Sequence, residues 1–236
     1  MNLPQQDAQG QDESILKLPA TQAGQAGQAG HAGHAGRLPA VLLFGMPGVG
    51  KGTQGSLLGT MNGMFHVSTG EIFRGLDLNS EDGKLVASYI DRGELVPDEV
   101  TIEVWQHWMS DQIAAQKFDP AADVLLLDGI PRRVRQCEIL EDHIDVLAVV
   151  HLAAPTDEPI IERLRSRALI EGRADDADER IIRRRFQIYR ETTQPVLGYY
   201  PPSIVHTVDP LGTQMEIKKR ILECVIPVIR QYERAG

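Results

Sequence analysis

Apolar residues gather in short, nearly continuous runs along this chain instead of alternating with polar residues. The runs occupy residues 41–44, 65–67, 124–127, 146–152 and 204–208. Runs of this kind are typical of strands that are buried on both faces, which is the pattern of parallel sheets. We therefore predict a five-stranded parallel sheet.

Longer segments of mixed polarity separate these runs and are predicted to be helical. They cover residues 51–61, 71–76, 84–92, 98–115, 133–142, 157–168, 178–199 and 212–232. Alternating strands and helices predict an α/β fold, a three-layer sandwich with helices on both faces of the sheet. Ligands of such folds bind at the carboxyl ends of the strands. The residues that follow the first three strands are therefore expected to face one cleft.

The first part of the chain has a different character. Residues 21–36 repeat a short unit of Gln or His, Ala and Gly, and residues 1–38 show no apolar periodicity. Such a composition cannot bury enough apolar surface to offset the entropy of ordering. We predict a flexible low-complexity tail over residues 1–38 and one domain over residues 39–236. The tail lacks the apolar core of a signal peptide, so a secretory leader is not expected.

Charge and cysteine content narrow the class of protein. The net charge of −9 disfavours nucleic acid as a partner, and no run approaches the ~18 apolar residues of a membrane span. Cys137 and Cys224 lie far apart and outside any C-x-x-C pair, which argues against zinc and a disulfide framework. We expect a cytoplasmic protein with no nucleic-acid or membrane partner. Arginines crowd residues 163–190, which suggests a focused anion site.

A glycine-rich turn directly follows the first apolar run. Residues 45–54 read GMPGVGKGTQ. A strand, a glycine turn and a helix form the context of a phosphate-binding loop, in which backbone N–H groups and the helix N-terminus point at an anion. Lys51 adds an ammonium that can reach the outer phosphates. Gly52 stands where a Ser or Thr is usual, and the hydroxyl follows at Thr53. We predict nucleoside triphosphate binding.

A carboxylate ends the third predicted strand. Residues 124–129 read VLLLDG, so a buried strand would present Asp128 at the same edge as the glycine turn. An acid in this place can hold, through water, the Mg²⁺ that bridges the phosphates of a nucleotide. The simpler alternative is that Asp128 only caps the next helix.

Several blocks resemble adenylate kinases, which are nucleoside monophosphate kinases. After the glycine turn come HVSTGEIFR at 66–74, GELVPDE at 93–99, DGIPR at 128–132 and EGRADD at 171–176, then an arginine-bearing helix. The resemblance covers nearly all of residues 40–230, and the spacing from Arg163 to Arg173 is similar to the short-lid form. It implies a monomer that transfers a phosphoryl group from MgATP to AMP, with Mg²⁺ and no zinc. It also implies a nucleoside-monophosphate-binding insertion at about 69–98 and a lid at about 165–177.

The resemblance assigns roles to individual residues. The expected catalytic residues are Lys51, Arg132, Arg167, Arg173 and Arg185. The expected ATP-binding residues are Gly48, Gly50, Lys51, Gly52, Thr53, Arg163 and Gly212. The expected AMP-binding residues are Thr69, Arg74, Leu95, Val96, Gly129, Arg132 and Gln136. The segment between Arg173 and Tyr189 is one residue longer than in the family pattern, so Arg184 is an alternative to Arg185. We favour Arg185 because it keeps the helical register with Ile182.

Two other functions fit the same blocks. A UMP/CMP kinase of this fold is the nearest, although Thr69 and Gln136 favour AMP because the resembling pyrimidine enzymes differ there. A nucleotide-binding regulatory module with little turnover is the other, because two segments depart in length from the family pattern.

Overall fold

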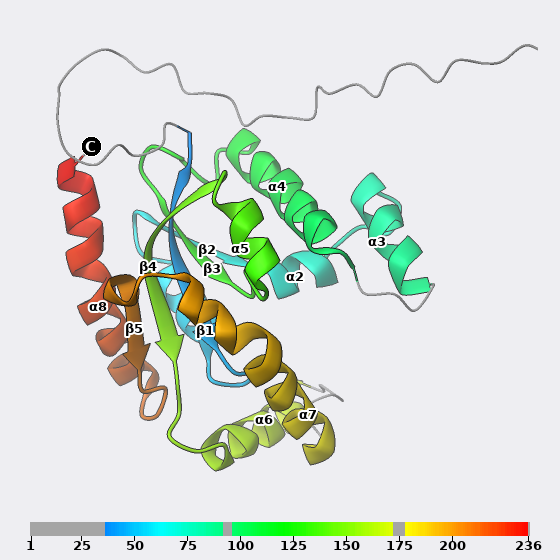
Figure 1. Ribbon diagram of the computed structural model, residues 1–236, viewed down its shortest axis with the longest axis vertical. Helices are drawn as coiled ribbons and strands as arrows, with labels where there is room; N and C mark the ends of the chain where they lie inside the picture. Colours follow the sequence, from blue (N-terminus) through cyan, green and yellow to red (C-terminus); the bar gives the residue numbers. More distant parts are fainter. Residues whose placement is uncertain (1–35, 92–95, 172–177, 236) are drawn as a thin grey trace, which may run out of the picture.

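The computed structural model of the protein describes residues 36–91, 96–171 and 178–235. Within these ranges, five strands form one parallel sheet in the order β2-β3-β1-β4-β5 (Figure 1). The strands are β1 (Leu38–Gly45), β2 (Met64–Ser68), β3 (Val124–Asp128), β4 (Ile144–Leu152) and β5 (Val205–Val208). The five-stranded parallel sheet predicted from the apolar runs is confirmed.

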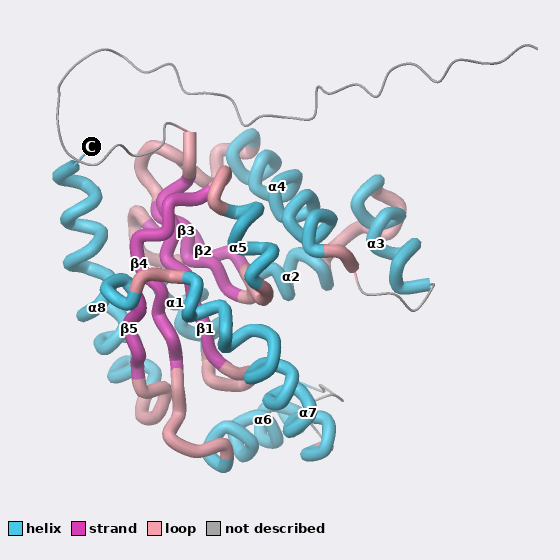
Figure 2. The backbone as a smooth tube through the Cα atoms, viewed as in Figure 1, coloured by secondary structure: helices cyan, strands magenta, loops and turns pink. Residues whose placement is uncertain are grey.

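Helices connect the strands and cover both faces of the sheet. They are α1 (Lys51–Leu58), α2 (Thr69–Arg74), α3 (Glu81–Asp91), α4 (Asp98–Ala114), α5 (Val134–Leu140), α6 (Glu158–Glu171), α7 (Glu179–Ile188) and α8 (Gln214–Ala235). Helices α4 and α8 lie on opposite sides of the sheet, and α3 projects away from it on the side of α4 (Figure 2). The three-layer sandwich is thereby confirmed.

The central strand shows why its sequence is apolar without interruption. All eight residues of β1 are buried, and successive side chains point to opposite faces. Leu42 and Phe44 belong to the core shared with α4 and α5, whereas Val41 and Leu43 belong to the core shared with α1, α6, α7 and α8. Since helices cover both faces, no position of the strand reaches solvent, and no polar alternation develops.

The domain begins earlier than its sequence pattern indicated. Leu38, assigned to the tail, is the first residue of β1, is 4% exposed, and donates its N–H to the His143 carbonyl at 2.9 Å. Pro39 lacks an N–H and weakens the strand signal, yet proline is tolerated near the start of a strand. The boundary therefore moves to Leu38 or before it.

The predicted helix over residues 178–199 is a second correction. Helix α7 ends at Ile188, and a π-helical turn, η2 (Tyr189–Thr193), and a 3-10 helix, η3 (Gln194–Tyr199), complete the segment. Pro195 lacks an N–H, and its ring would clash with the carbonyl four residues earlier in a continued α-helix. The Thr192 hydroxyl donates to the Ile188 carbonyl at 2.7 Å and satisfies one group at this transition.

The described parts of the two predicted insertions lie beside the sheet. Residues 69–98 contain α2, α3 and the first residue of α4, and residues 165–171 form the end of α6. The rest of the predicted lid, residues 172–177, and residues 92–95 lie outside the described residues. Every helix in the described ranges is too short or too polar to span a lipid bilayer.

Candidate active site

The loop between β1 and α1 has the backbone that its glycines permit. Gly45, Gly48 and Gly50 adopt φ angles of 147°, 86° and 101°, in the region where side chains are disfavoured. A Cβ at Gly48 would lie 2.5 Å from Cγ of Leu164 on α6, so the loop can pack this closely only without a side chain. Gly50 directly precedes α1, where the N–H groups of the first turn are available to an anion.

Lys51 is held by the loop that it follows. Its Nζ donates to the carbonyls of Gly45 at 2.7 Å and Met46 at 3.2 Å. Desolvation by burial lowers the pKa of this ammonium, Asp128 opposes that effect, and the positive charge of Arg132 lowers the pKa further. Arg185 and Arg167 act on the pKa of Lys51 in the same direction as Arg132. Four cations and one carboxylate therefore share this region.

Asp128 ends β3 next to the loop. It is 9% exposed and pairs in register with Leu43 of β1 on one side and Ser68 of β2 on the other. A Cβ built on Gly52 would lie 3.6 Å from Oδ2 of Asp128, so Gly52 brings the backbone of α1 near this carboxylate. Thr53 is exposed in the same first turn.

A second group of predicted residues lies around the ends of β2 and β3. The Thr69 hydroxyl donates to the Asp128 carbonyl at 3.3 Å, and Gly129 adopts a φ of 89° beneath it. Nε of Arg132 donates to the Gly129 carbonyl at 2.8 Å. Desolvation lowers the pKa of Arg132, Asp128 opposes it, and Arg185, Arg133 and Arg74 lower it further. Arg74 and Arg185 are thus near enough to Arg132 to act on its charge.

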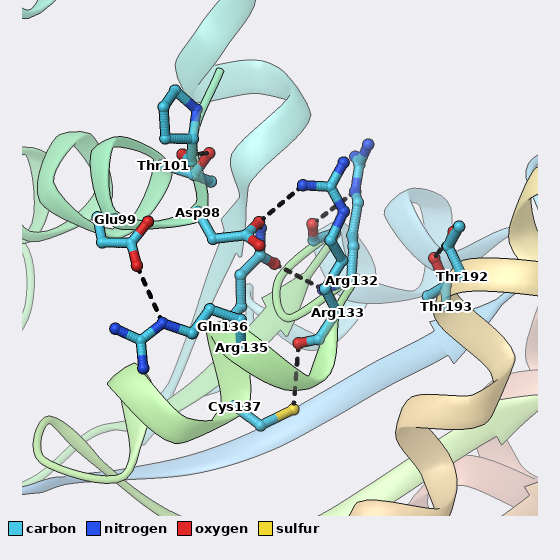
Figure 3. A network of polar contacts seen from close by, with 12 residues as sticks. Asp98, Glu99, Thr101, Arg132, Arg133, Arg135, Gln136, Cys137, Thr192 and Thr193 are labelled. Atoms are coloured by element: carbon cyan, nitrogen blue, oxygen red, sulfur yellow. Dashed lines mark hydrogen bonds and ion pairs between the residues drawn. The ribbon is translucent and has the colours of Figure 1, made fainter. Parts of the chain in front are cut away.

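Gln136 lies in a network of side chains between α4 and α5 (Figure 3). It is 5% exposed; its Oε1 accepts from the backbone N–H of Arg132 at 2.6 Å, and its Nε2 donates to Oδ1 of Asp98 at 2.7 Å. Nη1 of Arg133 donates to the same Asp98 oxygen at 3.1 Å. Sequence reasoning placed Gln136 in the site but missed Asp98, because an acidic residue in the first turn of a helix is already explained by the helix dipole.

Arg163 joins the loop to the segment before α8. Its Nη1 donates to the Val49 carbonyl at 3.1 Å, and its Nη2 donates to the Pro210 carbonyl at 3.2 Å. Gly212 follows with a φ of 115°, close to the carboxylate of Glu216. Arg163, Gly50 and Gly212 therefore form one rim of the site, on the side of β4 and β5. Thr69 and Gln136 form the opposite rim, on the side of β2 and β3.

The neighbouring arginines on α7 differ in their surroundings. Arg185 is partly buried, and its charge lowers the pKa of both Lys51 and Arg132. Arg184 is exposed, and its Nη1 donates to Oε1 of Gln187 on the same helix at 3.0 Å. The structure therefore brings Arg185 to the site and leaves Arg184 at the surface.

The remaining predicted residues are placed as follows. Val96 is partly buried and packs against the core shared with α4 and α5. Arg173 and Leu95 lie outside the described residues. Among the described residues, no three His, Cys, Asp or Glu side chains gather in a way that could hold a metal ion.

Two hollows are lined by none of the predicted site residues. A groove of about 650 Å³ runs along α8 between Met215 and Pro227 and contains none of the predicted site residues. A hollow of about 410 Å³ lies between β2, α2 and α4, lined by His66, Glu71 and Trp108 among others. The converging charges and the glycine loop, and not the size of a hollow, identify the candidate site.

A parallel sheet with a glycine loop, a lysine and a strand-terminal aspartate at its carboxyl edge defines a P-loop nucleotide-binding protein. The adenylate kinase family model matches residues 43–204. An adenylate kinase of Flavobacterium psychrophilum is 38% identical over 192 residues, covering 78% of this chain and 97% of the relative. Those of Streptomyces avermitilis and Thermus thermophilus are 33% and 35% identical, with 78% and 77% of this chain and 96% and 94% of each relative covered. The chain belongs to the adenylate kinase family.

Proposed function

We propose that this protein transfers a phosphoryl group reversibly from MgATP to AMP, giving two ADP, at the carboxyl edge of the sheet. One observation carries the proposal: positively charged side chains converge there from the start of α1, from the residues before α5, and from α7. Lys51, Arg132 and Arg185 repel one another, as the lowered pKa values of Lys51 and Arg132 reflect. Asp128 is the carboxylate that opposes these shifts, and two nucleotides facing each other through their phosphates would bring the negative charge that such a cluster binds.

The donor nucleotide is assigned to the loop. Backbone N–H groups from Gly48 to Thr53 would surround its phosphates, and Lys51 would exchange the Gly45 and Met46 carbonyls for phosphate oxygens. Arg163 and Gly212, on the same rim, would border the base. In this orientation, the terminal phosphate would lie toward Arg132 and Arg185.

Asp128 is the residue that would hold Mg²⁺, through water. A carboxylate is the oxygen donor that Mg²⁺ prefers, and the absence of a side chain at Gly52 keeps this carboxylate accessible from the loop. When bound with ATP, the ion would neutralise phosphate charge and align the terminal group.

The acceptor nucleotide is assigned to the opposite rim. Arg74 and Arg132 would bind its phosphate, since a guanidinium binds phosphate through two parallel hydrogen bonds and keeps its charge. Thr69 and Gln136 would contact the adenine, with Leu95 and Val96 beside it. The acceptor oxygen is already anionic, so the reaction needs alignment, charge neutralisation and exclusion of water more than it needs a general base.

Three arginines are assigned to the transferring group. Arg167 and Arg185 act electrostatically on Lys51, and Arg173 follows α6 in the predicted lid. Closure of the lid and of the insertion at about 69–98 would bring these groups together and exclude water.

The acceptor and donor preference tests this function. The purified full chain is assayed for ADP formation with AMP, CMP or UMP as the acceptor, ATP or GTP as the donor, and magnesium. We expect ATP with AMP to give the highest kcat/KM. Faster use of CMP or UMP would identify a pyrimidine nucleotide kinase, and nucleotide binding without ADP formation would identify a regulatory module.

We also propose that the protein works as a monomer in the cytoplasm. All groups assigned to the site come from one chain, so completion by a second subunit is not needed. Cys137 and Cys224 are free thiols, which supports a reducing compartment. Light scattering of the purified protein and fractionation of cells check the two statements.

A further inference from the structure

Asp98 occupies a half-buried position between α4 and α5, and α5 carries the acceptor-site residue Gln136. It is the first residue of α4, and its side chain is 11% exposed. Its Oδ1 accepts from Nε2 of Gln136 at 2.7 Å and from Nη1 of Arg133 at 3.1 Å (Figure 3). One carboxylate oxygen therefore receives two donors, one from α5 and one from the residue that precedes it.

The contact with Asp98 decides how the Gln136 amide is turned. The oxygen and nitrogen of an amide have nearly the same shape, so their hydrogen-bond partners set the orientation. A carboxylate only accepts, so Asp98 draws the NH₂ group toward α4. The amide oxygen then faces the backbone N–H of Arg132, which donates to it at 2.6 Å.

The same contacts fix Arg132. Its backbone N–H is held by Gln136, and its Nε is held by the Gly129 carbonyl at 2.8 Å. Arg132 is therefore held at two points, its backbone N–H and the Nε of its guanidinium. A chain of hydrogen bonds runs from Asp98 through Gln136 to Arg132, and the acidic member strengthens it because charge-assisted hydrogen bonds are stronger than neutral ones.

We propose that Asp98 is a positioning residue for the acceptor nucleotide. It orients Gln136 toward the base and, through Gln136, keeps the Arg132 backbone in place for the phosphate. This inference rests on the proposed function, because it concerns the assigned acceptor rim. It predicts that Asp98 affects the use of AMP and leaves the use of ATP nearly unchanged.

A neighbouring ion pair provides a matched control. Oε1 of Glu99 accepts from Nε of Arg135 at 2.9 Å, which joins the same two helices one residue further along α4. Both side chains are exposed, at 59% and 56%. Glu99→Ala and Asp98→Ala each remove one carboxylate from the first turn of α4. Each also removes one partner of an arginine at the start of α5, Arg135 in the first case and Arg133 in the second. They differ in that Asp98 also holds the buried amide of Gln136.

The experiment compares steady-state kinetics of the full chain and its variants. In Asp98→Ala, KM for AMP should rise about tenfold, because the buried amide donor of Gln136 loses its partner, while KM for ATP stays within about twofold. The preference for AMP over CMP should narrow. Asp98→Asn, which keeps one accepting oxygen, should lie between Asp98→Ala and the wild type, and Glu99→Ala should change both KM values less than about twofold.

A double-mutant cycle separates positioning from a general structural effect. In a Gln136→Ala background, Asp98→Ala should raise KM for AMP by less than about twofold, because the side chain through which it acts is gone. The proposal is overturned if the tenfold effect persists in that background, if KM for ATP rises equally, or if Glu99→Ala behaves like Asp98→Ala. Thermal unfolding shows whether each variant is folded.

The outcomes also separate this inference from the proposed function. Failure of the wild type to form ADP from AMP would overturn both. A normal wild type, a Gln136→Ala variant with impaired AMP use and a silent Asp98→Ala variant would overturn only the role of Asp98.

Discussion

Arg184 and Arg185 allow a test of the site in which only position differs. They are adjacent on α7, carry the same charge and have the same helix propensity. Arg185 acts electrostatically on Lys51 and Arg132, whereas Arg184 is exposed and bonds to Gln187 on its own helix. Alanine at either position removes one guanidinium and keeps a good helix former.

The expected effects of the two substitutions differ greatly in size. Loss of one preorganised charge at a developing anion costs about 3–4 kcal/mol, or about 10²–10³ in kcat, and we expect this for Arg185→Ala. The hydrogen bond of Arg184 is a surface contact between residues three apart, worth about 0.2–0.5 kcal/mol of stability. Arg184→Ala should therefore keep kcat within about twofold of the wild type.

The assay is ADP formation from ATP and AMP at saturating magnesium, followed in parallel with thermal unfolding. Arg185→Ala should lose turnover and still unfold in one cooperative thermal transition, because alanine keeps the helix propensity of α7 while the guanidinium is removed. Equal losses in the two variants, or a larger loss in Arg184→Ala, would refute the assignment of Arg185 and the register on which it depends.

Three further predictions concern the loop and the edge strand. Lys51→Met should lower kcat by about 10²–10³ and keep the fold, because it removes a buried ammonium that would stabilise charge in the transition state. Near-normal turnover would show that the loop is not catalytic. Gly48→Ala should destabilise the protein by at least about 2 kcal/mol in urea unfolding, since φ is 86° and the new Cβ would lie 2.5 Å from Leu164, whereas Gly198→Ala meets nothing within 4 Å and should be nearly neutral. Burial lowers the pKa of His66 below 6.5, so the unfolded chain takes up a proton at this residue before the folded chain does as the pH falls. The free energy of unfolding should therefore decrease with falling pH below 6.5. His66→Gln should flatten that dependence in thermal unfolding at several pH values.

The sequence indicated the sheet well because its central strands β1 and β3 are buried on both faces. Residues 124–127 were predicted as a strand from four consecutive apolar residues, and all five residues of β3 are buried. The limits of elements were less predictable. Two of the boundary errors involve proline: Pro39 hid the start of β1, and the effect of Pro195 on the preceding helix was underestimated.

The site was predictable where backbone geometry dictates sequence. The glycines of the loop are required by their φ angles and by the approach of α6, and such requirements leave a local pattern. Asp98 left none, because its role arises from a contact with Gln136, 38 residues further along the chain. A contact between separate helices depends on how they pack, which periodicity within either helix does not reveal.

Repulsion among the like charges around Lys51 links the folding stability of this protein to the binding of its substrates. The folded chain holds several cations close together, so a bound nucleotide would relieve repulsion that does not exist in the unfolded chain. Ligand at a hundred times its dissociation constant adds about 2.7 kcal/mol to folding stability. Copies of the enzyme should therefore resist heat and proteolysis longest when nucleotides are abundant, and depletion of the adenylate pool should shorten their lifetime.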